Sequence, residues 1–303
     1  MLIELEELTK TYGAVTALAG LSVALPGGAM GLLGPNGAGK TTMIRSLLGL
    51  IRIDSGRGRV LGMDIERQAL EIRQAVGFVP EDECLFPGVT GVQFVAYAGE
   101  LVGMPSRDAL RRSHEMLDYV GLGEARYRRV ESYSTGMKQR LKIAAGIVHD
   151  PKLLILDEPT NGMDPAGREE ILALCRDLAG AKGMNLLISS HLLPDVEAVC
   201  EYVVVLGRGR LLAQGRIADL KRPHDGEFEL RVRGDQEAFA RILADRGVKA
   251  DPVDDRLRIA LPAGEGVASL WEAAEDSSEQ IRMLRPRRST LEEVFLNAVG
   301  GAG

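Results

Sequence analysis

The sequence predicts an α/β protein with a doubly wound core and a small second domain. Two short, nearly all-apolar runs, "KLLILDEP" and "MNLLISSH", are typical of strands buried on both faces of a parallel sheet. A helical segment separates them, as in doubly wound folds. Around "LKRPHDGEFEL" the composition turns polar, and we expect a linker there. The 303 residues suffice for one large and one small domain.

The first elements are expected to be strands. Residues 2–13, "LIELEELTKTYG", alternate apolar and acidic residues, as a half-exposed edge strand does. The apolar run at 29–34 predicts a second strand that ends at a glycine, and residues 40–51 have the spacing of a helix. Helical patterns dominate between Thr90 and Val148, so we expect an all-helical insertion at about 88–150.

The first domain is expected to comprise residues 1–222, and residues 225–303 predict a small second domain. The stretches "FELRVR", "RLRIAL" and "IRMLRP" alternate as strands do, and three helical stretches are interleaved with them in the order β-α-β-α-β-α. Ser289 and Glu292 have the spacing of a capping box, which predicts the start of the last helix.

Composition limits the classes of function. The formal net charge of −6 argues against a protein that binds nucleic acid through a basic face, and we expect no nucleic-acid partner. The three cysteines lie far apart, so they indicate neither a disulfide framework nor a zinc site, and a reducing cytoplasm fits best. No stretch approaches the roughly 18 consecutive apolar residues of a membrane helix. If the protein acts at a membrane, another chain spans it.

The most informative motif is "GPNGAGKTT", residues 34–42, which matches G-x-x-x-x-G-K-[ST] between a predicted strand and a predicted helix. Glycines allow backbone N–H groups to surround a phosphate, and the helix N-terminus and Lys40 add positive charge. Thr41 would supply a hydroxyl group to Mg²⁺. The alternative is a glycine-rich turn with a chance lysine. The residues expected to bind phosphate are Gly34, Asn36, Gly37, Ala38, Gly39, Lys40, Thr41 and Thr42.

Two adjacent carboxylates, Asp157 and Glu158, stand at the end of the apolar run "LLILDEP". Because α/β folds hold ligands at the carboxyl ends of their strands, we expect this pair beside the phosphate site. One carboxylate can hold the magnesium shell while the other accepts a proton from water, since adjacent strand residues point to different sides. Alternatively, the pair consists of solvated acids at a strand end.

Ordered motifs over about residues 1–220 resemble the ATP-binding subunit of an ABC transporter. Besides the phosphate loop, they are "VGFVPEDECLFPGVT" at a magnesium-sensing loop, "YSTGMKQR" at the signature motif, "LLILDEP" at the catalytic strand, "TNGMDP" at a dimer-contact loop and "LLISSH" at a switch histidine. The resemblance implies a P-loop ABC ATPase core with an N-terminal antiparallel β part and a helical subdomain, plus a small C-terminal α+β domain. It implies ATP and Mg²⁺ as ligands.

The resemblance also implies roles for single residues. Tyr12 would stack on adenine, although a tyrosine at a strand end can also serve packing alone. Glu158 would deprotonate the attacking water, which leaves the magnesium shell to Asp157. His191 would contact the γ-phosphate, whereas a lone histidine after a strand can instead be structural. Glu81 stands where the broad family has glutamine, and a carboxylate next to Mg²⁺ is electrostatically favourable, so Glu81 is a candidate ligand.

The signature stretch, residues 133–140, would act on ATP held by a second copy of the chain. Ser134 and the N–H of Gly136 would contact the γ-phosphate at the N-terminus of a helix. Ser134 could also merely cap that helix. The stretch departs from L-S-G-G-Q at Thr135 and at Met137, so no contact is assigned to Met137.

The implied function is a cytoplasmic ATPase that dimerises around two ATP molecules at the inner face of the cell membrane and powers separate integral membrane permease subunits. "FVPE", "YSTGMKQR" and "STLEEVF" resemble the subfamily that drives bacterial ABC-2 type exporters, to which a C-terminal accessory domain is often appended. One alternative is a soluble ABC-type ATPase acting on ribosomes, DNA or protein assembly. Another is a non-catalytic nucleotide-binding module, which Lys40 and Glu158 disfavour.

Overall fold

The structure is a computed structural model that describes residues 1–221, 223–262 and 264–300. It consists of two compact units. The first comprises Met1–Ile217 with residues 297–300, and the second comprises Ala218–Leu296. The predicted domain bounds, residues 1–222 and 225–303, stay a prediction. Among the helices of the described ranges, none combines the length and the hydropathy needed to cross a bilayer.

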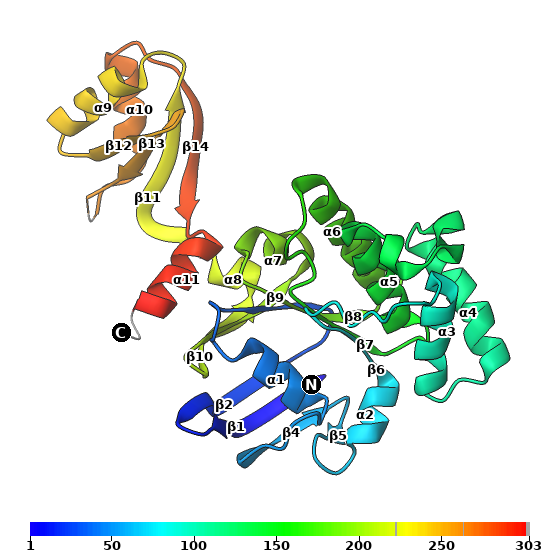
Figure 1. The fold of residues 1–303 in the computed structure, drawn as a ribbon. Coiled ribbons are helices and arrows are strands. Elements are labelled where there is room, and N and C mark those ends of the chain that lie inside the picture. Colours follow the sequence, from blue (N-terminus) through cyan, green and yellow to red (C-terminus); the bar gives the residue numbers. More distant parts are fainter. Residues whose placement is uncertain (222, 263, 301–303) are drawn as a thin grey trace. The chain divides into compact units, whose positions relative to one another are not determined.

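The centre of the first unit is a six-stranded sheet in the order β10-β9-β3-β8-β7-β6 (Figure 1). Its strands run parallel except for β10, which pairs with β9 in the antiparallel direction. Every residue of β3 and β7 is buried, as the apolar runs predict. The strands are β3 (Ala29–Leu33), β6 (Val76–Val79), β7 (Leu153–Asp157), β8 (Asn185–Ser190), β9 (Tyr202–Gly207) and β10 (Arg210–Arg216).

Helices cover both faces of this sheet (Figure 1), so the predicted doubly wound α/β core is confirmed. α1 packs between the two sheets of this unit, whereas α5, α6 and α7 lie on the opposite face. α1 ends earlier than residue 51 because Gly49, with φ of 59°, terminates it in the left-handed conformation. The helices are α1 (Lys40–Leu47), α2 (Ala69–Ala75), α5 (Thr135–Ile147), α6 (Pro165–Gly180) and α7 (Leu193–Val199), and the short α8 (Ile217–Leu220) begins at Ile217 and continues into the second unit.

A second, antiparallel sheet has the order β2-β1-β4-β5. The prediction that residues 2–13 form an edge strand is wrong, because β1 pairs with β2 on one side and with β4 on the other. Its alternating pattern has a different cause: an antiparallel sheet can face the core on one side and solvent on the other. The strands are β1 (Ile3–Tyr12), β2 (Val15–Leu25), β4 (Ser55–Val60) and β5 (Met63–Asp64).

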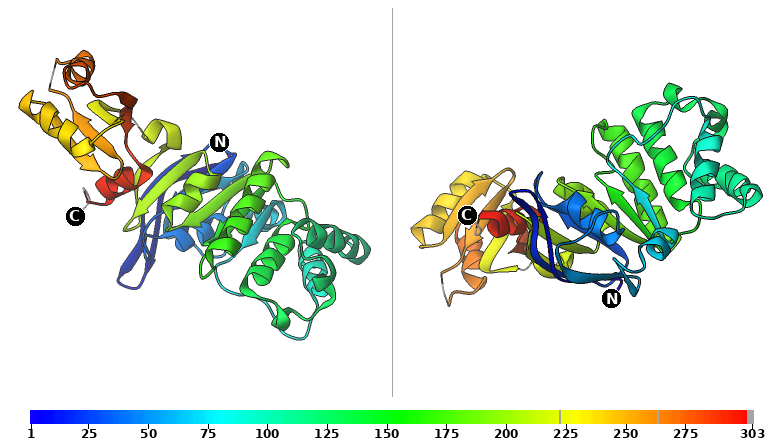
Figure 2. Two further views of the ribbon diagram at one scale, coloured as in Figure 1. Left: turned by 90° about the horizontal axis from the view of Figure 1, so that it is seen from above. Right: turned by 60° about the horizontal axis from the view of Figure 1, so that its bottom comes forward.

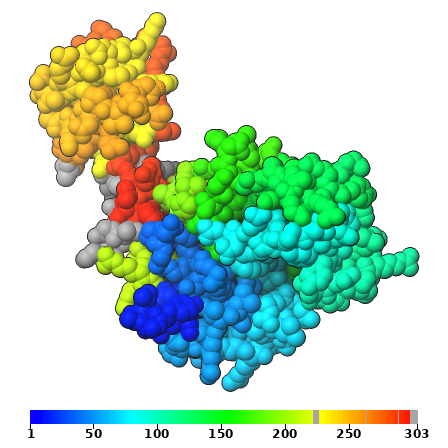
Figure 3. Space-filling model, viewed as in Figure 1, coloured from blue at the N-terminus to red at the C-terminus, as the bar shows by residue number. Residues whose placement is uncertain are grey.

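The predicted helical insertion consists of α3 (Gly91–Leu101), α4 (Ser106–Tyr119), two 3₁₀ turns and α5. Thr90 and Gln93 form a capping box that begins α3. This helical part lies at one end of the first unit, as Figure 2 shows, and its atoms form the teal and green surface in Figure 3.

The second unit has a four-stranded antiparallel sheet in the order β12-β13-β11-β14. The element order β-α-β-β-α-β is that of ferredoxin-like folds, and the helices bury one face of the sheet around Phe239 and Leu270. The sequence prediction lacked β12, whose Pro252 and polar residues weaken its strand pattern. The elements are β11 (Pro223–Val232), α9 (Gln236–Asp245), β12 (Lys249–Val253), β13 (Arg256–Ala260), α10 (Ala268–Asp276), β14 (Ile281–Arg288) and α11 (Leu291–Gly300), of which α11 belongs to this unit as far as Leu296.

Two local predictions for this unit are wrong. The expected linker is mostly strand, because β11 begins at Pro223 and pairs with β14. The capping box of α11 is formed by Thr290 and Glu293, which exchange two hydrogen bonds of 3.1 Å, rather than by Ser289 and Glu292. Both pairs have the required spacing, and the choice follows from Leu291, which is fully buried as the first helical residue.

Candidate nucleotide-binding site

The phosphate-binding loop joins β3 to α1 at the carboxyl end of a central strand, where α/β folds bind ligands. Gly39 is the N-cap of α1 and has φ of 103°, which side chains other than glycine rarely adopt. A Cβ atom at this position would lie 2.5 Å from the carbonyl oxygen of Ala17. The loop therefore needs glycine here for both conformation and space. The free N–H groups of the first turn of α1 suit an anion.

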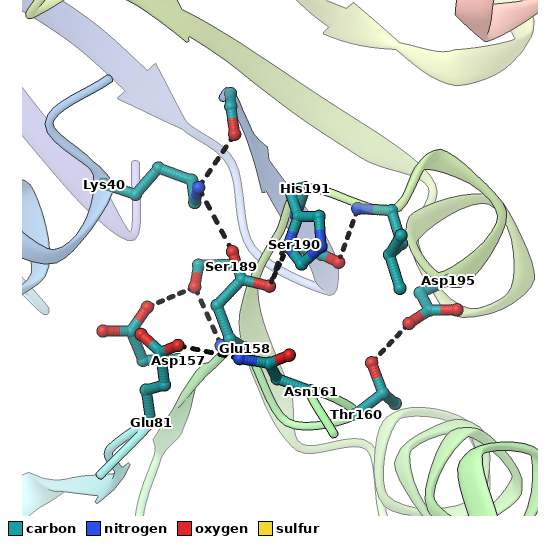
Figure 4. Close-up of polar contacts among 12 residues, drawn as sticks. Lys40, Glu81, Asp157, Glu158, Thr160, Asn161, Ser189, Ser190, His191 and Asp195 are labelled. Carbon is teal, nitrogen blue, oxygen red and sulfur yellow. Dashed lines mark hydrogen bonds and ion pairs between the residues drawn. The ribbon is translucent and has the colours of Figure 1, made fainter. Parts of the chain in front are cut away.

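The ammonium group of Lys40 lies inside this loop (Figure 4). Its Nζ donates to the carbonyl oxygens of Gly34 at 2.8 Å and Pro35 at 3.4 Å, and it lies 3.1 Å from Oε1 of Glu158. Lys40 is 6% exposed. A buried positive charge at the loop is what a phosphate group requires.

Thr41 and Asp157 meet beside the loop. The hydroxyl of Thr41 donates to Oδ2 of Asp157 at 3.0 Å, and Ser189 donates from Oγ to the other carboxylate oxygen. Ser189 lies opposite Asp157 in the β7–β8 register, and both side chains are buried. Hydroxyl and carboxylate oxygens are the hard ligands that Mg²⁺ prefers, so this donor set fits that ion. Sequence reasoning missed Ser189, although two serines in the apolar run "LLISSH" were a signal.

Glu158 and His191, the two predicted catalytic residues, are in direct contact. Nδ1 of His191 lies 2.8 Å from Oε2 of Glu158, and the backbone N–H of His191 donates to the same oxygen at 3.4 Å. Glu158 has φ of 48°, and a non-glycine residue in this left-handed region carries strain that is common at functional sites. The N–H of Glu158 donates to both Oγ and the carbonyl oxygen of Ser189 at 3.1 Å, which holds this conformation.

Glu81 lies just after β6, in a loop that reaches the same site. Its Oε1 accepts a hydrogen bond of 2.9 Å from Nδ2 of Asn161 (Figure 4), a contact that the sequence did not predict. Thr160, next to Asn161, donates to the buried Asp195 of α7, which fixes the loop that follows β7. A pocket of about 330 Å³ is lined by Pro35, Asn36, Gly37, Ala38, Lys40, Thr41, Glu81 and Glu158.

The other residues that the sequence predicted for the site are not among those that line this pocket. Tyr12 ends β1 with 47% of its surface exposed, and Nζ of Lys10 lies 5.3 Å from its ring centroid. Ser134 is the N-cap of α5 and accepts a hydrogen bond from the N–H of Met137 at 3.3 Å, so the capping role is observed. Gly136 lies in the first turn of the same helix. Five more predicted residues stand next to residues that line the pocket. Gly34, Gly39 and Thr42 belong to the phosphate loop and the start of α1, whereas Asp157 contacts Thr41 and His191 contacts Glu158.

Comparison with known proteins identifies the family. A model described as "ABC transporter" matches residues 18–161. The linearmycin resistance ATP-binding protein LnrL of Bacillus subtilis is 34% identical over 307 aligned positions, and the alignment covers 99% of this chain and 98% of that protein. The chain belongs to the ABC transporter family. It is an ATP-binding, ATP-hydrolysing transporter subunit, so the predicted family and the predicted ATPase activity are confirmed.

Two further similarities extend over most of the chain. The daunorubicin/doxorubicin resistance ATP-binding protein DrrA of Streptomyces peucetius is 36% identical to this ABC subunit, over 98% of this chain and 92% of that protein. A solved structure of an ATP-binding subunit of an ABC transporter matches with a TM-score of 0.65 and 28% identity, covering 73% of this chain and 92% of that chain. The predicted fold class, an ABC ATPase core, is confirmed.

Proposed function

We propose that this chain is the ATPase subunit of an ABC-2 type exporter, peripheral on the inner face of the cell membrane. Two copies enclose two ATP molecules and drive separate integral membrane permease subunits. The observation that carries the proposal is the buried ion pair of Lys40 and Glu158, with the exposed His191 in contact with the same carboxylate. LnrL and DrrA are named for resistance to linearmycin and to daunorubicin or doxorubicin, which supports a toxic small molecule as the exported substrate.

The site residues take the following roles in this proposal. The phosphate loop and Lys40 bind the phosphates, and Thr41 and Asp157 hold Mg²⁺, with Glu81 beside them. When bound, Mg²⁺ supplies positive charge against the phosphate oxygens. Glu158 accepts the proton of the attacking water, and His191 orients its carboxylate through the 2.8 Å contact.

A second copy of the chain completes each site. Ser134 and Gly136 begin α5, whose N-terminal dipole favours an anion, and we assign them to the γ-phosphate held by the other copy. Tyr12 is accessible for stacking on adenine. An N-cap at an open helix end also offers unpaired N–H groups, so capping and phosphate binding are compatible.

An apolar pocket of about 320 Å³ in the first unit is the proposed docking site of the permease. Its walls include Phe78, Phe94, Leu101 and Val102. Leu101, at the end of α3, and Leu50 both line this pocket and are 68% and 51% exposed, and exposed apolar side chains that gather in one place mark interaction sites. A permease segment with an apolar anchor would cover them. The alternative of a soluble ATPase acting on ribosomes, DNA or protein assembly is not favoured by the relatives.

The ATP sandwich is tested by the molar mass of Glu158→Gln protein in light scattering, with and without Mg-ATP. Slow hydrolysis should trap the dimer, so we expect a doubling that requires ATP. The further substitution Ser134→Arg should abolish the doubling, because it fills the space for the partner's phosphate. A constant mass, in protein shown to bind ATP, would contradict a sandwich formed by this chain alone.

The permease contact is tested by co-purification from membranes. Leu101→Glu should abolish recovery of the integral membrane partner, because a charge at the pocket is costly to desolvate. Leu110→Glu is the matched control, since Leu110 is 48% exposed on α4 and does not line the pocket. Equal recovery with both variants would argue against this pocket as the docking site.

A further inference from the structure

The ammonium group of Lys142, on α5, is bonded to three consecutive backbone carbonyls. Its Nζ donates to the oxygens of Pro80 at 2.8 Å, Glu81 at 3.3 Å and Asp82 at 3.1 Å. Lys142 is 7% exposed. An ammonium group has three donors and no acceptor, so these contacts satisfy it completely.

The carbonyls belong to the loop that carries Glu81 to the nucleotide pocket. Residues 80–82 follow β6 outside any regular element, so hydrogen bonds of a helix or sheet do not fix their backbone. The Glu81 side chain lines the nucleotide pocket, whereas Lys142 lines the separate apolar pocket together with Pro80. The lysine thus holds the loop from the side opposite to the nucleotide.

A buried amine at this place has a cost that packing alone does not explain. Burial lowers the pKa of Lys142, because the charged form loses water, while the neighbouring acidic groups act against that shift. Leucine or methionine would fill the same helix face without this cost. The gain from lysine is the fixed position of three carbonyls, which an apolar side chain cannot hold.

We propose that Lys142 is a positioning residue for ATP hydrolysis, which holds the backbone of residues 80–82 so that the Glu81 carboxylate faces the phosphate site. The hydrogen bonds that Nζ makes within the described residues all go to the loop backbone, so we expect the effect to reach the reaction through Glu81. Asn161 holds the other end of this side chain by its 2.9 Å bond to Oε1 of Glu81. Backbone and carboxylate are therefore fixed independently.

The first test is steady-state ATPase activity of the purified full chain with Lys142→Met, which keeps an unbranched apolar side chain one atom shorter and removes all three donors. We expect kcat to fall about 10-fold, the Mg²⁺ concentration for half-maximal rate to rise, and the KM for ATP to change little. The matched control is Lys152→Met at an exposed lysine before β7, for which we expect wild-type kinetics. Wild-type kinetics for Lys142→Met would overturn the proposal.

A double-mutant cycle separates positioning from a general structural role. If Lys142 acts through Glu81, then Lys142→Met should change kcat by less than about twofold in a Glu81→Ala background. A double variant whose loss equals the product of the single losses would overturn the proposal, and so would full activity of Glu81→Ala alone. Wild-type turnover in the same assay tests the ATPase function separately.

A second, milder substitution is included in case Lys142→Met folds poorly, since Met leaves the carbonyls of residues 80–82 without the hydrogen bonds of the ammonium group. Lys142→Gln supplies an amide with two donors on a side chain one atom shorter, and thermal unfolding measured alongside reports its stability. We expect wild-type stability with kcat between those of wild type and Lys142→Met. Wild-type kcat and Mg²⁺ dependence in a folded Lys142→Gln protein would overturn the requirement for the ammonium group.

Discussion

Nζ of Lys40 lies 3.1 Å from Oε1 of Glu158, and both side chains are more than nine-tenths buried. This ion pair links the phosphate loop directly to the carboxylate that is proposed to activate water. A charge buried here without a partner would cost several kcal/mol, on the order of 3–5 when one member of a pair is removed. Phosphate oxygens compete with Glu158 for the same ammonium group, so nucleotide binding and the position of the base are coupled.

We expect Glu158→Gln to lower ATP turnover by about two to four orders of magnitude, because the amide cannot accept the proton of water. ATP affinity should be kept or improved, since the neutral amide no longer competes for Lys40. Phosphate release and calorimetric ATP binding measure the two effects. Glu201→Gln, at an exposed residue after α7, is the control and should behave as wild type. Unchanged turnover in Glu158→Gln would refute the assignment.

Tyr12→Ala should raise the Kd for ATP about 10-fold, because stacking of a base on an aromatic ring contributes roughly 1–3 kcal/mol. Tyr12→Phe keeps the ring and should bind ATP as wild type does. The Kd for inorganic triphosphate, which lacks a base, should be the same in all three proteins. Equal ATP affinity of the alanine and phenylalanine variants would show that Tyr12 serves packing alone.

The sequence predicted those site residues that stand at fixed places in motifs. Each of these residues stands at the end of an apolar strand or in a glycine-rich turn: Lys40, Asp157, Glu158 and His191. The structure brings them together at the carboxyl ends of the neighbouring strands β3, β8 and β7. Lys142 could not be predicted in this way. It lies 60 to 62 residues from the carbonyls that it contacts, and nothing near it in the sequence identifies those partners.

The fold could be predicted where burial of a strand requires an apolar composition. β3 and β7 are apolar throughout because both faces of the parallel sheet are covered. The position of β1 within its sheet was not predictable, because alternation shows which face is exposed and not which edges are paired. β12 was missed since its residues are mostly exposed and include Pro252.

Gly77→Ala should destabilise the first unit, because a Cβ atom at this position of β6 would lie 2.0 Å from the carbonyl oxygen of Gly146 in α5. The helix that carries Ser134 and Lys142 would have to move, and overpacking of this kind costs about 1–3 kcal/mol. Urea unfolding followed by far-ultraviolet circular dichroism measures the change, together with the ATPase rate.

The control for this substitution is Gly180→Ala, in the last turn of α6. An added Cβ there meets no atom within 4 Å, so alanine should stabilise the helix by about 0.5–1 kcal/mol. We therefore expect Gly77→Ala to lower the free energy of unfolding and Gly180→Ala to raise it. Equal stability of Gly77→Ala and wild type would mean that β6 and α5 separate at little cost.

Acid should weaken the second unit through Glu229 of β11. Hydrogen bonds from Arg285 and then Arg256 lower the pKa of Glu229 below its ordinary value of about 4.5. A carboxyl group with a depressed folded pKa contributes stability above its unfolded pKa, and this contribution is lost as the pH falls through the folded pKa. Glu229→Gln should therefore be less stable than wild type at neutral pH, with a difference that vanishes as the pH falls below about 4.5.

Fluorescence of Trp271, the only tryptophan of the chain, reports the unfolding of this unit because it lies on α10. Urea titrations at several pH values give the difference in unfolding free energy between Glu229→Gln and wild type. Glu275→Gln, at an exposed carboxylate on the same helix as Trp271, should show a smaller difference at neutral pH. A Glu229→Gln difference that stays constant from neutral pH into the acid range would mean that packing, and not the charge on Glu229, stabilises the contact with Arg285 and Arg256.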